Sequence, residues 1–156
     1  MEIENIIKKK ESELLKEPNN ILKLRELGEL YKNNNDVNNT LKYYLKYTEH
    51  HVDPYILHEI GICYFRLSKY TSALKYCLIV LKFTTNIPDL YNNIATCYIN
   101  LKKYSYALPY LIKSYELLKN DTVCNMLGNL YFYMKQYDNS IKYYNMIENK
   151  DKLKTY

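Results

Sequence analysis

Residues 60–77 read IGICYFRLSKYTSALKYC, and residues 127–144 read LGNLYFYMKQYDNSIKYY. Laid one over the other, the two stretches match in their small residues, tyrosines and apolar positions without a gap. Their offset contains two repeats, because four small residues form a ladder with steps of 33, 34 and 33: Gly28, Gly61, Ala95 and Gly128. A period near 34 residues predicts an architecture of stacked repeats.

Composition limits the kinds of protein that the chain can be. It has 156 residues, of which 47% are hydrophobic and 25% are charged, so it is long enough for one globular domain with a sizeable core. Its three glycines all stand on the ladder, although glycine weakens a helix by roughly 1 kcal/mol against alanine. The net charge of +5 is spread along the chain rather than gathered, so we expect no nucleic-acid binding.

Each repeat reads as two helices joined by a short polar break. Leu57, Ile60, Tyr64 and Leu67 have helical spacing, Ser68 and Lys69 form the break, and a second helix is predicted from about residue 71 to residue 83. Three other dipeptides predict helix starts, two of them with proline at the first helical position: Asp53-Pro54, Pro88-Asp89 and Asn120-Asp121. Pro109 is expected near the first turn of its helix, where a missing N–H costs little.

The glycine ladder predicts close approach between the paired helices. The expected partners are small residues of the second helix: Thr40 for Gly28, Ala73 for Gly61 and Ser140 for Gly128. Tyr64 and Tyr70 are expected to fill the wedge between the two helices.

The sequence resembles the tetratricopeptide repeat (TPR) family over about residues 21–150. One unit supplies the residues of that family's pattern as Leu57, Ile60-Gly61, Tyr64, Tyr70, Ala73 and Cys77. The chain departs from the pattern in having no tryptophan, in Ala95 at one glycine position and in the larger Thr40. The resemblance implies an all-α fold, a right-handed α-α superhelix of about four helix hairpins. The units are expected at about 21–53, 54–87, 88–120 and 121–153, in an array over 18–156 behind an N-terminal capping helix, 1–17.

The two ends of the array carry their own expectations. Residues 3–16 have a helical pattern, but Lys10 and Glu13 fall where a true second helix would be apolar, which indicates a capping helix. At the other end, an apolar face is expected at Tyr143, Tyr144, Ile147 and Leu153. We therefore keep a homodimer through an end helix as a hypothesis.

Nothing in the sequence indicates catalysis. No glycine remains for a phosphate-binding loop, and no serine or cysteine lies in a recognisable nucleophile motif. We expect no cofactor and no metal, since His50, Asp53 and His58 read as an ordinary polar linker. The four cysteines have no CxxC spacing, and no leader or membrane segment is visible, so we predict a cytoplasmic protein with reduced thiols.

The resemblance implies that the first helix of each pair lines a concave binding groove. An amide ladder of Asn92, Asn125 and Asn129 suits a peptide backbone, and Phe65, Ile99 and Phe132 form an apolar strip. The predicted groove residues are Tyr55, His58, Ile62, Phe65, Arg66, Asn92, Thr96, Ile99, Asn125, Asn129, Phe132 and Tyr133. In the first unit the same stripe holds Leu22, Arg25, Glu29 and Lys32.

The groove does not fit the carboxylate clamp by which some TPR domains hold chaperone C-termini. Its positions here hold Arg25, Glu29, Glu59, Asp89 and Asn93, and three acids would repel a carboxylate.

The sequence thus predicts a non-catalytic protein–protein interaction module, an adaptor that binds a peptide or helix of a partner in the groove. Three alternatives stay open. They are a small chaperone for a secretion or assembly client, a regulatory or oligomerising domain for an enzyme, and a self-assembling structural array.

Overall fold

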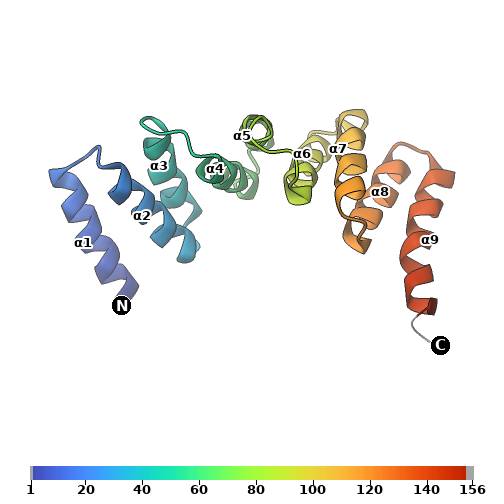
Figure 1. Cartoon of the computed structure of the whole chain (residues 1–156), viewed down its shortest axis with the longest axis horizontal. Coiled ribbons are helices and arrows are strands. Elements are labelled where there is room, and N and C mark those ends of the chain that lie inside the picture. Colours follow the sequence, from blue (N-terminus) through green and yellow to red (C-terminus); the bar gives the residue numbers. More distant parts are fainter. Residues whose placement is uncertain (1, 154–156) are drawn as a thin grey trace. The chain divides into compact units, whose positions relative to one another are not determined.

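The structure is a computed structural model that describes the backbone of residues 2–153 and the side chains of residues 3–147. Those residues form nine α-helices and no strand (Figure 1). The helices are α1 (Glu2–Lys16), α2 (Ile21–Asn33), α3 (Val37–Thr48), α4 (Pro54–Arg66), α5 (Tyr70–Val80), α6 (Pro88–Asn100), α7 (Tyr104–Leu117), α8 (Asp121–Tyr133) and α9 (Tyr137–Leu153).

The chain divides into two compact units. Unit 1 is Met1–Phe83 and unit 2 is Thr84–Tyr156. Within unit 1, α2 packs on α3 and α4 on α5; within unit 2, α6 packs on α7 and α8 on α9. The prediction of an all-α fold built from helix hairpins is therefore confirmed.

Helix starts follow the predicted caps in two of three cases. The Asp53 carboxylate accepts a hydrogen bond from the Tyr55 backbone N–H at 2.9 Å, with Pro54 at the first helical position. Asn120 accepts in the same way from the Val123 N–H at 2.8 Å. α6 has proline at its first position, but its N-cap is Ile87, whose side chain cannot accept a bond. The α6 start thus relies on the fixed φ of proline alone.

Pro109 lies further inside its helix than the sequence predicted. α7 begins at Tyr104, so Pro109 is in its second turn rather than its first. There the missing N–H removes an internal bond to the carbonyl four residues earlier, instead of an N–H that would have been unpaired anyway. The expectation that this proline costs little is wrong.

Stacked tyrosines join the two helices of every pair. The rings of Tyr31 and Tyr43 lie parallel with their centroids 5.5 Å apart. Equivalent pairs recur at 5.5 Å, 5.7 Å and 5.6 Å: Tyr64 with Tyr76, Tyr98 with Tyr110, and Tyr131 with Tyr143. Tyr64 therefore pairs with Tyr76 and not, as predicted, with Tyr70, whose ring meets Phe65 edge-on.

The glycine ladder does allow close approach, but larger partners than predicted use it. A Cβ at Gly28 would overlap the Tyr44 ring, and a Cβ at Gly128 would lie 2.6 Å from the Tyr144 ring. At Gly61 the nearest atom is Cys77 Sγ at 3.1 Å, with the Ala73 carbonyl oxygen at 3.6 Å. The small residues pack more loosely because they lie one helical turn earlier on the second helix.

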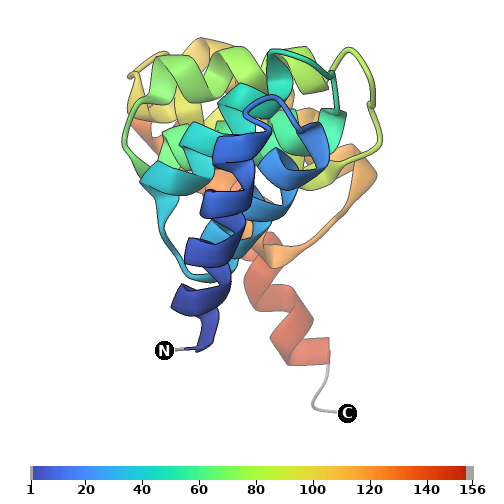
Figure 2. The same cartoon turned by 90° about the vertical axis from the view of Figure 1, so that its left-hand side faces the viewer.

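The N-terminal helix α1 caps unit 1 with two apolar residues and one carboxylate. Ile7 and Leu14 are buried, whereas Ile3, Ile6 and Leu15 of the same helix stay exposed. Figure 2 shows α1, in dark blue, beside α2. Glu11 Oε1 accepts hydrogen bonds from the Tyr31 hydroxyl at 2.8 Å and the Tyr43 hydroxyl at 2.7 Å, so it ties α1 to α2 and α3.

Each unit has its own apolar core. That of unit 1 includes the fully buried Leu27, Tyr44 and Ile60, and that of unit 2 includes Leu111 and Leu127. The four cysteines are free thiols and buried. Within the described residues, no helix has the length and apolar character that a membrane span requires.

Candidate binding faces on the first helices

The α8 face of unit 2 carries a chain of three polar side chains. The Tyr144 hydroxyl of α9 donates to Asn129 Oδ1 at 2.7 Å, and Asn129 Nδ2 donates to Asn125 Oδ1 at 3.3 Å. Both asparagines are exposed. Since each bond fixes which end of the next amide faces which way, Tyr144 orients both amides. Asn125 is left with its N–H groups turned away from Asn129, where a peptide carbonyl could accept from them.

Asn92 on α6 has a different environment from Asn125 and Asn129. Its Oδ1 is buried and has no hydrogen-bond partner. Its backbone carbonyl accepts from the Thr96 hydroxyl at 2.7 Å, and both residues are half-buried. Ile99, one turn on, packs against the unit 2 core. The three asparagines therefore do not form one equivalent ladder.

Aromatic rings flank the amides at the end of α8. Phe132 is 56% exposed and Tyr133 is 55% exposed. Phe132 meets the Tyr137 ring edge-on at 5.7 Å, and Tyr133 stacks on Tyr104 at 5.4 Å. These contacts hold large apolar surfaces in place while leaving more than half of each ring open to a partner.

The corresponding face of unit 1 is charged. Lys32 of α2 donates to the Tyr55 hydroxyl of α4 and lies 5.0 Å from the centroid of that ring. The same ammonium is 2.9 Å from a Glu29 carboxylate oxygen and 3.7 Å from one of Glu59. α2 and α4 are thus joined by one lysine between two acids and a tyrosine.

The remaining predicted residues of α4 are less open. His58, Ile62 and Phe65 are half-buried, and Arg66 is exposed in the last turn. Phe65 meets the Tyr70 ring edge-on at 5.5 Å, so it packs within its own helix pair. Of the apolar strip that the sequence predicted, only Phe132 presents most of its ring.

The charges of the unit 1 cluster depend on one another. Burial of Glu29 by itself would raise the pKa of its carboxyl, but the hydrogen bond from Lys32 outweighs burial and holds the pKa below its usual value. Burial would likewise lower the pKa of Lys32, yet its bonds to Tyr55 and Glu29 raise it. Burial, together with the nearby Glu29 charge, raises the pKa of Tyr44. Tyr44 therefore stays protonated while Glu29 and Lys32 stay charged.

Two residues of these faces escaped the sequence analysis as site residues. Tyr44 and Tyr144 come from second helices, cross the bare face of Gly28 and Gly128, and bring their hydroxyls to Glu29 and Asn129. The signal in the sequence is a tyrosine 16 positions after the glycine. It occurs in the first and last repeats only, since the other two have Cys77 and Leu111 there.

Comparison with known proteins gives a family and a fold. The family model described as tetratricopeptide repeat matches residues 88–120 and 121–145. A crystal structure of MamA is similar with a TM-score of 0.86 at 18% identity, over 97% of this chain and 90% of that one. MamA from Desulfovibrio magneticus RS-1 is similar at 0.83 and 13% identity, over 99% and 88%.

YrrB, described as a TPR protein with an unusual peptide-binding site, is similar with a TM-score of 0.83 at 14% identity, over 91% of this chain and 74% of that one. A comparison with curated proteins finds no match. The chain has the fold of helical-repeat interaction proteins. It is a tetratricopeptide repeat protein, as the resemblance of its sequence implied.

No group of three or more His, Cys, Asp or Glu side chains in the described part of the chain is arranged to hold a metal ion. The chemistry that the two faces offer is hydrogen bonding, ion pairing and apolar contact.

Proposed function

We propose that this protein is a non-catalytic adaptor that binds a peptide or helix of a partner protein on the first helices of its pairs. The α8 face binds the main chain of the partner, and the exposed aromatic rings beside it bind an apolar side chain. We further propose that it works in the cytoplasm, which its free, buried thiols support.

The observation that carries the proposal is the chain of bonds from Tyr144 through Asn129 to Asn125. Exposed asparagines are usually free to rotate, and holding one costs side-chain entropy. Here a second-helix hydroxyl orients two exposed amides, next to aromatic rings that are more than half exposed. Pre-oriented donors beside an open apolar surface are what a peptide-binding site needs.

The test is affinity capture from native lysate with mass spectrometry, comparing the parent with the Asn125→Ala/Asn129→Ala variant. We expect a partner that the parent retains and the variant loses. A matched control is Asn38→Ala/Asn139→Ala, which removes two exposed amides from the first turns of α3 and α9. Circular dichroism must show equal helicity in all three proteins.

A partner held equally by the parent and the Asn125→Ala/Asn129→Ala variant would contradict the α8 site. Loss of the partner in the control variant as well would show that the effect is not specific to this face.

A second candidate function, self-association through α9, is favoured by the exposure of its apolar residues. In α7, Tyr104 and Leu108 are half-buried, and α7 packs on the following helix α8. Their equivalents in α9, Tyr137 and Ile141, are 53% and 56% exposed. Sedimentation velocity across a range of concentrations tests this candidate. Dimers that Ile141→Glu abolishes would support it, and a monomer at all concentrations would exclude it.

A further inference from the structure

The unit 1 face holds one negative charge more than it can neutralise. Glu29 and Glu59 share the single ammonium of Lys32, at 2.9 Å and 3.7 Å, and their side chains are only 31% and 16% exposed. The charged groups beside them are already paired: Arg25 with Asp53 at 3.3 Å, and Lys10 with Glu26. A partly buried carboxylate without a full counter-charge is costly, so the cluster is electrostatically incomplete.

A second observation at the same place is the hydroxyl of Tyr44. Tyr44 is completely buried, and its oxygen makes no hydrogen bond of normal geometry. The ring crosses Gly28, and the charged neighbours of the hydroxyl are Glu29 and Glu59. A buried hydroxyl without a partner is rare and unfavourable. It indicates that the Glu29 carboxylate has its best arrangement in another state of the cluster, one in which its bonds are redistributed.

The third observation is a hollow that gives access to Glu29. It measures about 350 Å³ on the surface of α1 and α2, and its lining residues are Lys10, Arg25, Glu26, Glu29, Leu30 and Asn33. Leu30 offers an apolar wall and Glu29 a carboxylate. That combination suits a long side chain with an aliphatic stem and a cationic head.

We propose that this hollow binds a lysine or arginine side chain of the partner segment. The stem packs on Leu30 and the cation pairs with Glu29, which supplies the missing positive charge. Glu29 then shares Lys32 less, so its carboxylate can turn to accept from Tyr44. The inference rests on the proposed function, binding on the first helices, and adds that unit 1 selects a basic residue. The occupant has the opposite charge to the carboxylate that the clamp of other TPR domains holds.

The test uses two small probes, N-acetyl-arginine amide and N-acetyl-norleucine amide, titrated into the isotope-labelled full chain at low salt. Backbone amide shifts in α2 are the readout. We expect the arginine probe to shift these amides with an affinity roughly 10-fold above that of norleucine, as one charge-assisted hydrogen bond would give. Added salt should weaken the arginine shifts selectively.

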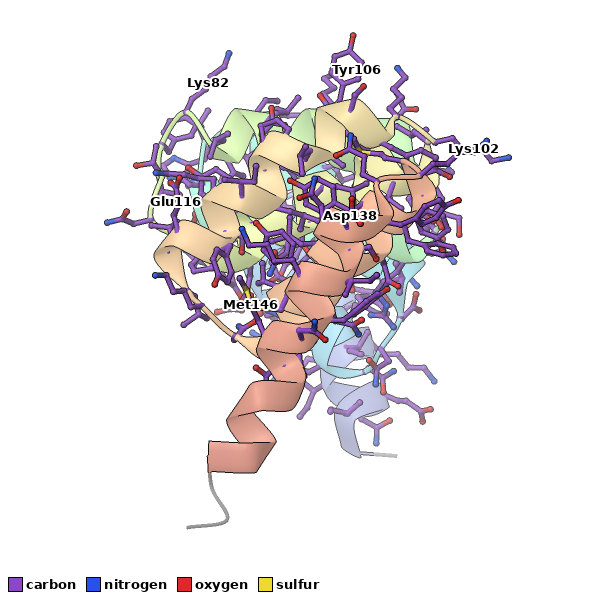
Figure 3. All side chains as sticks on the ribbon, turned by 90° about the vertical axis from the view of Figure 1, so that its right-hand side faces the viewer. Lys82, Lys102, Tyr106, Glu116, Asp138 and Met146 are labelled. Atoms are coloured by element: carbon purple, nitrogen blue, oxygen red, sulfur yellow. The ribbon has the colours of Figure 1, made fainter. Side chains whose placement is uncertain are left out.

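Glu29→Gln should remove most of the preference for arginine, and Glu59→Gln should reduce it. The matched control is Glu116→Gln in α7, because that carboxylate is 56% exposed, pairs with Lys113 at 3.0 Å and points away from the ribbon (Figure 3). The preference must survive in this control. The parent protein alone already decides the inference if a variant fails to fold, because equal shifts by both probes would overturn it.

Failure here is distinguishable from failure of the proposed function. A partner that depends on Asn125 and Asn129, together with no preference for arginine over norleucine, would overturn only the inference about unit 1.

Discussion

At Gly28 a whole aromatic ring occupies the place of a side chain. The Tyr44 ring would overlap a Cβ there, and because Tyr44 is fully buried it has no free space to move into. We expect Gly28→Ala to lower the free energy of unfolding by about 1–3 kcal/mol, the usual cost of overpacking, despite the better helix propensity of alanine. Thermal and urea unfolding followed by circular dichroism would measure it.

The matched control is Gly61→Ala in the same unit. There the nearest atom is Cys77 Sγ at 3.1 Å, so a small adjustment makes room for a methyl group. Its effect should lie well below that of Gly28→Ala. Equal losses at both sites would mean that the Tyr44 ring is not what requires glycine.

A pH dependence follows from the hydroxyl of Tyr31. Burial, with the hydrogen bond to Glu11, raises the pKa of Tyr31 to about 12, against 10.0 for an ordinary tyrosine. A raised pKa means that the folded state holds this proton more tightly than the unfolded state. The resulting stability is complete below pH 10 and is lost as the pH rises from 10 to about 12.

We therefore expect Tyr31→Phe to lose less stability than the parent between pH 10 and pH 12. Tyr106→Phe serves as the control, because Tyr106 is 62% exposed and projects from α7 (Figure 3). Urea unfolding at a series of pH values gives both slopes. Parallel curves for Tyr31→Phe and the parent would contradict the role of the Glu11 bond.

At the scale of helices, the proline in α7 is the clearest local defect. Pro109 is exposed and interrupts the hydrogen bonding of the second turn. Pro109→Ala should raise the free energy of unfolding of unit 2 by about 1–3 kcal/mol, since interior proline costs about 3 kcal/mol and alanine returns some chain entropy on unfolding. Pro54→Ala, at the first position of α4, should show no such gain. A chain stabilised equally by both changes would count against this explanation.

The helices themselves could be predicted from the sequence, because each depends on local signals. The glycine ladder, the apolar spacing around Ile60 and the caps Asp53 and Asn120 all act within a few residues. The stacked tyrosines were harder, because both Tyr70 and Tyr76 are near enough to meet Tyr64. Only the geometry of the helix pair decides for Tyr76.

The candidate site was predictable in its faces but not in its chemistry. Periodicity places Asn125 and Asn129 on the outer side of α8, where they are exposed. It does not reveal that Tyr144 reaches them from α9, because that depends on the length of the tyrosine and the bare surface of Gly128. In the same way Glu29 reads as an ordinary surface acid until Tyr44 and Lys32 are seen beside it.

At the scale of the whole chain, two cores imply two units of stability. The apolar cluster of unit 1 and that of unit 2 draw all their residues from their own unit. Repeat proteins are stabilised by contacts between neighbours, so a core defect is felt first near its own position. The chain should therefore lose stability locally when one core is damaged, rather than uniformly.

Leu111→Ala and Leu27→Ala test this with the same chemical change in each core, since both side chains are completely buried. Each should lower the protection of amides in its own unit by about 2–5 kcal/mol, the usual cost of such a cavity, and that of the other unit by clearly less. Native-state hydrogen exchange resolves the two units amide by amide. If Leu111→Ala reduced protection in α2–α4 as much as in α6–α8, the chain would be one cooperative block. The division into two units would then describe its packing and not its stability.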